Sequence, residues 1–138
     1  MSDTPRGIRN HNPGNIRWGD NWQGLDPNGK EKDKNFCVFT TAVWGIRALA
    51  KLLLTYYNKH NLDTVRKIIN RYAPPKENQT QAYIQSVAKQ IGVYPDTHIN
   101  IRDKVALMFI IKAIIRHENG IMPYSDEILK QGIELAGV

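Results

Sequence analysis

One carboxylate of this sequence stands where helix electrostatics disfavours a negative charge. The segment 104–119, KVALMFIIKAIIRHEN, is apolar on most faces and predicts a helix whose last turn contains Glu118. A carboxylate there faces the negative end of the helix dipole, at a cost of about 0.3 to 1 kcal/mol when exposed. This field disfavours ionisation, and a general acid acting near neutral pH needs a carboxyl group that keeps its proton. Glu118 is therefore the leading catalytic candidate, and the competing interpretation is an ion pair with Arg116, Lys112 or a basic loop residue.

A second unusual stretch lies near the N-terminus. Residues 6–17, RGIRNHNPGNIR, contain three arginines, three asparagines, two glycines and a proline. Pro13 and Gly14 predict a turn, and asparagine side chains commonly bond the backbone of such turns. We expect a rigid loop that forms one wall of a binding site, with its arginines contacting an anionic partner and orienting Glu118. A flexible basic arm is the alternative interpretation of the same composition.

Helices are the elements that must position these residues. Apolar side chains at helical spacing predict five of them, over residues 42–57, 64–72, 78–91, 104–119 and 126–136. The expected caps are Thr40 or Thr41, Asp63, Asn100 or Asp103, and Ser125 at the N-terminal ends, and Gly92 and Gly120 at two C-terminal ends. Gly45 permits close packing near the start of the first helix. Short strands are candidates at 16–18, within the turn-rich segment 6–36, and at 36–39, where this segment ends. The expected fold is mainly α, with about five helices and a small turn-rich N-terminal lobe.

Composition and charge restrict the classes of protein to which this chain can belong. With 138 residues, 41% hydrophobic and 23% charged, the chain fits one globular domain over residues 1–138. Cys37 is the single cysteine, so no internal disulfide can form, and four scattered histidines predict neither a metal site nor a cofactor. The formal net charge of +6 favours an anionic partner: nucleic acid, an anionic lipid surface or the bacterial cell wall. No apolar run is long enough to span a bilayer, and the N-terminus does not have the form of a signal peptide.

Several motifs follow one another within residues 6–120: RGIRNHNPGNIR, a following WQG, FCVF, GIRAL, INRYAPPKENQTQAYIQSVAKQIGV and RHENG. Taken in this order, they resemble a family of small bacteriophage and prophage muramidases. The resemblance implies a lysozyme-like α+β domain and an endolysin activity that cleaves the glycan strand of peptidoglycan. The chain departs from the family at Val43, where relatives often carry an acidic residue.

A weaker similarity connects the two ends of the chain. Bacterial glucosaminidases and lytic transglycosylases commonly carry a helix that ends in glutamate, followed by an N-x-x-G-I segment, an F-x-x-F/Y strand and another helix. Here the order is rotated, with RHENG last and NPGNIR, FCVF and GIRAL first, as a circular permutation would produce. The similarity therefore implies that Glu118 lies against the loop that contains Gly14.

The muramidase resemblance implies a glycosidase site around Glu118. Glu118 would be the acid that protonates the leaving glycosidic oxygen, and a second carboxylate stays unassigned among Asp20, Asp26, Asp33 and Glu77. Sugars bind to aromatic faces and to dense hydrogen-bonding groups. The expected substrate-binding residues are Asn12, Asn15, Arg17, Trp22, Gln23, Tyr72, Glu77 and Tyr83. Trp44 and Tyr56 are expected to pack in the core instead.

The alternative to an enzyme is a virion structural protein or a basic nucleic-acid-binding module. Lysine and arginine are spread along every segment, and no helix-turn-helix, zinc-finger or RNA-binding signature occurs, which disfavours nucleic acid. The enzyme reading implies a monomer that binds peptidoglycan and anionic wall polymers. It would stay in the host cytoplasm until its release to the wall, or travel in a virion. Whether the product is that of a hydrolase, a lytic transglycosylase or a glucosaminidase stays open.

Overall fold

The computed structural model describes residues 4–75 and 79–138, and within them the chain is mainly helical. The helices are α1 (Arg6–Arg9), α2 (Gly29–Lys32), α3 (Ala42–His60), α4 (Val65–Tyr72), α5 (Thr80–Ile91), α6 (Lys104–Asn119) and α7 (Asp126–Leu135). The five longer ones lie where apolar spacing predicts them, with ends shifted by up to three residues. The one-turn helices α1 and α2 were not predicted, because four residues are too few to show a helical period.

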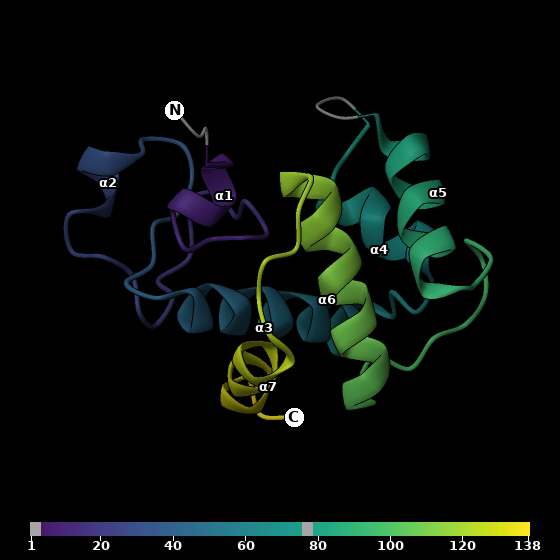
Figure 1. The fold of residues 1–138 in the computed structure, drawn as a ribbon. Coiled ribbons are helices and arrows are strands. Elements are labelled where there is room, and N and C mark those ends of the chain that lie inside the picture. The colour runs from purple at the N-terminus through teal and green to yellow at the C-terminus, as the bar shows by residue number, and fades with distance from the viewer. Residues whose placement is uncertain (1–3, 76–78) are drawn as a thin grey trace.

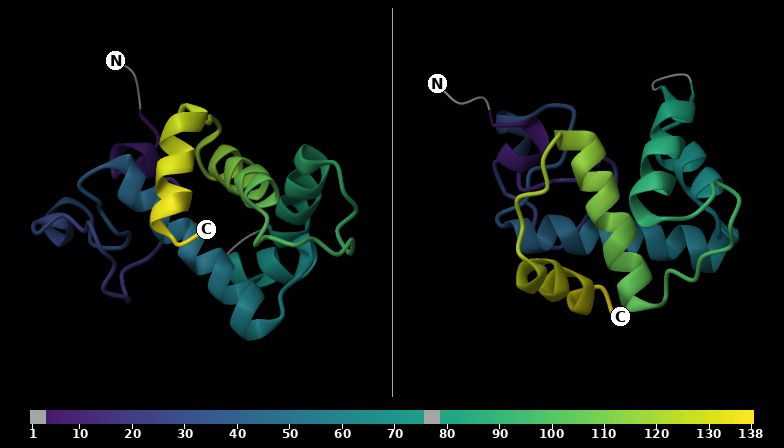
Figure 2. Two further views of the ribbon diagram at one scale, coloured as in Figure 1. Left: turned by 90° about the horizontal axis from the view of Figure 1, so that it is seen from below. Right: turned by 45° about the vertical axis from the view of Figure 1, so that its right-hand side comes forward.

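Helix α3 forms the base on which the other long helices are arranged. Figure 1 shows α3 running across the molecule, with α6 crossing it and α7 packed along its lower side. The pair α4 and α5 lies at one end, where α5 packs against α6, and the lobe that contains α1 and α2 lies at the other end (Figure 2). The C-terminal end of α6 meets α1, so the two segments that the sequence singles out are neighbours.

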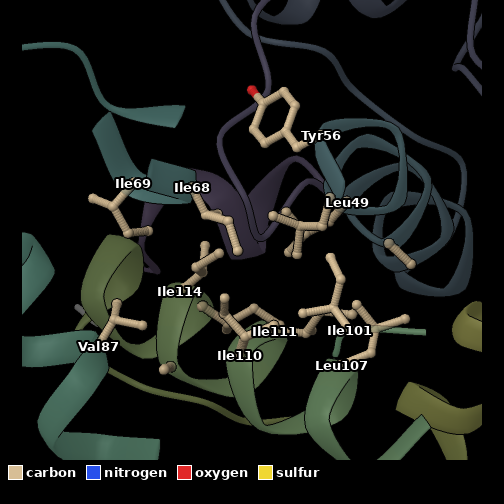
Figure 3. Packing of buried hydrophobic residues seen from close by; sticks show 14 of the residues in the cluster. Leu49, Tyr56, Ile68, Ile69, Val87, Ile101, Leu107, Ile110, Ile111 and Ile114 are labelled. Atoms are coloured by element: carbon tan, nitrogen blue, oxygen red, sulfur yellow. The ribbon is translucent and has the colours of Figure 1, made fainter. Parts of the chain in front are cut away.

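The core is one cluster of apolar side chains between α3, α4, α5 and α6. Its centre is built by Leu49, Ile68, Ile110, Ile111 and Ile114, each fully buried, and Figure 3 shows these side chains facing one another across the helices. Burial of apolar surface at about 25 cal/mol per Å² is the main force that holds the helices together. No helix in the described ranges has the length and apolar character needed to cross a membrane.

Four helix ends agree with the caps that the sequence predicts. The Asp103 carboxylate accepts hydrogen bonds from two amides in the first turn of α6, and the Ser125 hydroxyl accepts one in α7. At the other ends of α5 and α6, Gly92 and Gly120 both have φ of 76°, the left-handed conformation that glycine adopts without strain.

The cap predicted for α4 is wrong by one residue. Thr64 precedes the helix, and its side chain accepts a hydrogen bond from the Lys67 amide. The carboxylate of Asp63 instead pairs with the Lys67 ammonium group at 3.1 Å. Threonine and aspartate are both good caps, so local sequence alone did not discriminate between adjacent candidates.

The two strands expected in the N-terminal lobe are also wrong. In place of strands at 16–18 and 36–39, the lobe has isolated antiparallel bridges, one of which joins Arg17 to Phe36. Frequent turns interrupt the backbone before a ladder of hydrogen bonds can extend. The lysozyme-like α+β subdivision therefore stays a prediction, and the observed class is mainly α.

An ion pair closes this lobe. The buried Asp33 carboxylate accepts hydrogen bonds from Arg6 Nε at 2.6 Å and Nη2 at 2.7 Å, and from Asn10 Nδ2 at 2.8 Å. Backbone amides of Asn35 and Phe36 donate to the same carboxylate. The Arg6 guanidinium is the main reason why the pKa of Asp33 lies well below its usual range. The lobe is thus held together by charge and hydrogen bonds where regular strands are lacking.

Candidate functional site

Glu118 lies against the N-terminal loop, although 103 residues separate it from its partner there. Asn15 Nδ2 donates a hydrogen bond of 2.9 Å to Glu118 Oε1. The next residue strengthens the contact, because Asn119 Nδ2 donates to the carbonyl oxygen of Pro13 at 2.8 Å. The predicted meeting of RHENG and NPGNIR is therefore confirmed.

The second oxygen of Glu118 is bound by a tyrosine from α5. Tyr83 Oη donates to Glu118 Oε2 at 2.8 Å, and its ring stacks on the His117 ring with centroids 3.7 Å apart. Burial raises the pKa of Tyr83 well above its usual range, so the hydroxyl stays protonated and remains a donor at any working pH. Asn15 and Tyr83 thus hold the carboxyl group from two sides.

Glu118 has no ion-pair partner among the described residues, so neither Arg116 nor Lys112 forms the competing ion pair, whereas the basic loop residue Lys76 lies outside the described ranges. Arg116 donates from Nη1 to Gln90 at 3.3 Å, and Lys112 pairs with Asp126 at 2.8 Å. The groups that fix Glu118 are both neutral. Glu118 is thus a half-buried carboxyl group at the negative end of a helix, and its hydrogen-bond partners among the described residues are neutral.

Two hollows meet at Glu118. The first has a volume of about 280 Å³ and is lined by Gly14, Asn15, Ile16, Arg17, Phe36, Leu52, Tyr56, Tyr72, Ala73 and Glu118. The second has a volume of about 300 Å³ and is lined by Gln79, Ala82, Tyr83, His117 and Glu118. Because Glu118 lines both, the two hollows adjoin at its side chain.

Two glycines allow the backbone to approach the site closely. A methyl group at Gly7 would lie 2.5 Å from Asn119 Oδ1 and 2.9 Å from Asn15 Oδ1, so only glycine lets α1 pack on the end of α6. A methyl group at Gly14 would lie 2.5 Å from the hydroxyl of Tyr72, which donates a hydrogen bond to the Gly14 carbonyl oxygen. The pair of glycines in segment 6–17 therefore has a steric role.

The sequence of a bacteriophage protein aligns with almost the whole chain. Protein P5 of Pseudoalteromonas phage PM2 is 38% identical over an alignment of 138 residues, which covers 97% of this chain and 83% of that protein. The chain belongs to the Protein P5 family. Membership in the Protein P5 family links the chain to bacteriophage, in agreement with the phage origin that the sequence resemblance implies. No protein-family profile matches the chain, and the name Protein P5 states no activity.

Four of the residues expected to bind substrate lie around Glu118 in this member of the Protein P5 family. Asn15, Arg17 and Tyr72 line the first hollow, and Tyr83 lines the second. Whether they contact a glycan stays a prediction.

Asn12 does not fit the predicted role of a substrate contact. Its side chain is fully buried, and Nδ2 donates to the carbonyl oxygens of Ile16 and Cys37 at 2.9 Å each. Asn12 Oδ1 accepts from the Ile16 amide at 3.0 Å. Asn12 is thus a structural residue of the loop, since all its hydrogen-bonding capacity is directed inward.

The other expected contacts lie apart from the hollows or outside the described residues. Trp22 packs half-buried against the core, and Gln23 is exposed beside it; neither lines a hollow at Glu118. Glu77 falls in the segment 76–78, which is not described. Trp44 and Tyr56 pack against or within the core as expected, and Tyr56 also borders the first hollow.

The arginines of the loop do not orient Glu118, contrary to expectation. Arg6 pairs with Asp33, and Arg9 donates to the carbonyl oxygen of Thr4 at 3.3 Å. Arg17 lies over the Phe36 ring, 4.7 Å from its centroid. The neutral side chains of Asn15 and Tyr83 orient Glu118 instead of the arginines.

No second carboxylate lines either hollow in the described ranges. Asp33 is buried in its ion pair, and Asp26 binds Lys32 at 2.6 Å. Asp20 is exposed and lines neither hollow. Glu77, the fourth candidate for the second carboxylate, lies outside the described residues, so its role stays a prediction.

Sequence reasoning missed three residues of the site. Phe36 provides an apolar face in the first hollow, His117 stacks on Tyr83 in the second, and Asn119 bonds the loop. His117 and Asn119 flank Glu118 in the chain, which is a signal that could have marked them. No signal in the sequence marked Phe36, because only folding brings it next to Arg17.

Proposed function

We propose that this chain is a peptidoglycan-cleaving glycosidase of the muramidase type. The observation that carries the proposal is the setting of Glu118: half-buried at the end of α6, bound by Asn15 and Tyr83, and facing two adjoining hollows. A glycosidase needs a carboxyl group beside the scissile bond as its acid, in most families together with a second carboxylate, and binding surface on both sides of that bond. The resemblance to phage muramidases supports the same class of substrate, and the membership in a phage protein family supports only the phage origin.

In the proposed reaction Glu118 transfers its proton to the leaving glycosidic oxygen while the bond from that oxygen to the anomeric carbon breaks. Each carboxyl oxygen has two acceptor directions, so the bonds from Asn15 and Tyr83 leave one on each oxygen for this proton. A water molecule then adds its hydroxyl group to the anomeric carbon and returns its second proton to Glu118. One carboxyl group can serve as acid and then as base in this sequence.

Substitution of the acid tests the proposal directly. We expect Glu118→Gln to lower the rate of glycan cleavage by about 10² to 10⁴-fold, the usual contribution of a positioned general acid. Glu134→Gln is the matched control, because Glu134 is exposed on α7 and lies away from both hollows. Purified peptidoglycan is the substrate, and released fragments are quantified by mass spectrometry. No release by the wild type would overturn the enzyme proposal, and full activity of Glu118→Gln would overturn the assignment of the acid.

The ends of the fragments identify the reaction type. Reducing muramic acid indicates a muramidase, reducing glucosamine a glucosaminidase, and anhydro-muramic acid a lytic transglycosylase. We propose the first. The lack of a second carboxylate along the described parts of the hollows suits a mechanism in which water or the substrate supplies the nucleophile.

The net charge of +6 supports binding to anionic wall polymers, and we propose that the protein reaches the wall with a virion or after host lysis begins. Binding to whole walls is then expected to weaken as salt is raised, because the Debye length falls from about 10 Å at 0.1 M to about 3 Å at 1 M. Sedimentation of protein with washed walls at both salt concentrations measures this, and equal binding would contradict the electrostatic contribution.

A further inference from the structure

A pocket rich in positive charge lies at the opposite end of α6 from Glu118. It has a volume of about 390 Å³ and is formed by the C-terminal half of α3, by Arg102 and by residues 136–138. Arg102 precedes the first residue of α6, whereas Glu118 lies in the last turn of this 16-residue helix. At 1.5 Å per residue the two ends are about 24 Å apart, so this pocket is separate from the proposed glycosidase site. Figure 2 shows the C-terminal end of the chain beside α3, where this pocket forms.

Three cations line this basic pocket and no lining side chain is acidic, so the cations outnumber the backbone carboxylate that Val138 carries in this structure. Lys51 and Lys59 are eight residues apart on α3, which places them two turns apart on one face of the helix. Arg102 adds the third charge from a different segment. Within the described part of the chain, neither lysine has a carboxylate within 4 Å. Like charges gathered in this way repel one another, and a bound anion would relieve that repulsion.

The guanidinium group of Arg102 is held in one orientation. Its Nε donates to Asn58 Oδ1 at 2.8 Å, and its Cζ lies 5.5 Å from the centroid of the Tyr57 ring. No acceptor from the described residues binds its two Nη groups, so they remain free as a fork that matches two oxygens of an oxyanion. The amide nitrogen of Asn58 and the hydroxyl of Thr55 add neutral donors at the same pocket.

We propose that this basic pocket binds a phosphate group, either as a phosphomonoester or as a pyrophosphate. A phosphate dianion carries a charge of about −1.5 to −2 and three strong acceptor oxygens, which suits three cations with an oriented fork better than a single carboxylate does. The volume exceeds that needed by an inorganic ion and lies in the range of about 300 to 1,000 Å³ typical of sites for small molecules. The site does not depend on the glycosidase proposal.

Calorimetric titration of the full chain tests the site with inorganic phosphate, pyrophosphate, glycerol 3-phosphate and a short single-stranded oligonucleotide. We expect saturable one-site binding of pyrophosphate at low ionic strength. The double variant Lys51→Gln/Arg102→Gln should weaken it at least tenfold. The matched control is Lys34→Gln/Lys89→Gln, which removes the same charge at exposed positions away from the pocket and should change affinity less than twofold.

A second measurement does not depend on the folding of any variant. In NMR spectra of the wild-type protein, pyrophosphate should shift the Arg102 Hε signal and the Thr55 and Asn58 signals first. Equal weakening by the two double variants, or shifts spread evenly over the basic surface, would overturn the proposal in favour of general charge attraction. Binding of the oligonucleotide with no response to pyrophosphate would overturn it in favour of a nucleic-acid surface.

Discussion

At the scale of single residues, the site depends on neutral hydrogen bonds to one carboxyl group. Glu118 is an unfavourable residue for the end of a helix, and Asn15 and Tyr83 compensate by donating one hydrogen bond to each oxygen. Arginine partners would have placed a positive charge beside the carboxyl group. Asn15 and Tyr83 orient the group without adding a charge.

Removal of the Tyr83 hydroxyl tests this orientation. We expect Tyr83→Phe to lower kcat about tenfold with little change in KM, because the lost bond is worth about 1.5 kcal/mol and does not contact the distant parts of a glycan. The phenylalanine ring can still stack on His117. Tyr94→Phe is the control, since Tyr94 is 82% exposed and should leave kcat unchanged. Steady-state kinetics on soluble peptidoglycan fragments measures both values, and an unchanged kcat in Tyr83→Phe would show that Asn15 alone suffices.

At the scale of elements, the contact between α1 and α6 decides whether the site forms. The one-turn helix α1 approaches the end of α6 only because Gly7 has no side chain. The start of α3 has the same kind of contact, as expected from the sequence: a methyl group at Gly45 would overlap the carbonyl oxygen of His11. The loop that contains Asn15 is thus pressed between α3 and α6.

Gly7→Ala should therefore move α1 away from the end of α6. We expect a loss of about 1 to 3 kcal/mol in the free energy of unfolding, as for other overpacked contacts, together with lower glycan cleavage. Gly19→Ala is the control, because a methyl group at Gly19 would meet no atom within 4 Å. Urea denaturation and the cleavage assay measure the two effects. Equal behaviour of the two variants would contradict the close approach.

The cap at the start of α6 is a second element whose contribution can be measured. We expect Asp103→Ala to lower the free energy of unfolding by about 1 kcal/mol, because two amides of the first turn lose their acceptor. Thermal denaturation followed by circular dichroism reports the change. Gln131→Ala, at an exposed position of α7, should have no comparable effect. An unchanged transition in Asp103→Ala would mean that water replaces the cap without loss.

At the scale of the whole molecule, stability at low pH should depend on the ion pair that closes the N-terminal lobe. Asp33 has a lower pKa in the folded chain than in the unfolded chain, so its ionised form stabilises the fold at any pH above about 4. This contribution is lost as the pH falls through the unfolded and then the folded pKa. The lobe carries Asn15 and Arg17, so its loosening also disturbs the proposed site.

Asp33→Asn should remove this dependence on pH. At neutral pH we expect a loss of about 2 kcal/mol in the free energy of unfolding, because a buried acceptor of charge-assisted hydrogen bonds is weakened. The difference between variant and wild type should shrink as the pH falls below about 4, because the unfolded wild-type chain then takes up a proton at Asp33 that the folded chain still resists. Urea titrations at several pH values measure it, with Asp20→Asn at an exposed position as control. A constant difference at all pH values would refute the electrostatic origin.

Sequence alone determined the five long helices, most of their caps and the position of Glu118 at the end of α6. These features depend on residues a few positions apart, such as Ser125 with the first turn of α7 or Gly120 after Asn119, and local energies decide them. The choice between Asp63 and Thr64 failed because neighbouring residues offered nearly equal caps.

The sequence resemblance implied that Glu118 meets the loop with Gly14, but only the tertiary structure decided which side chains bind it. Its partners Asn15 and Tyr83 come from segments 103 and 35 residues away, and no local pattern ranks one asparagine or tyrosine above the others. The same holds for Asn12, which resembles Asn15 in the sequence but is buried to satisfy the backbone of its own loop. Sequence periodicity does not encode the packing between distant elements. This packing places the carboxyl group of Glu118 between two hollows.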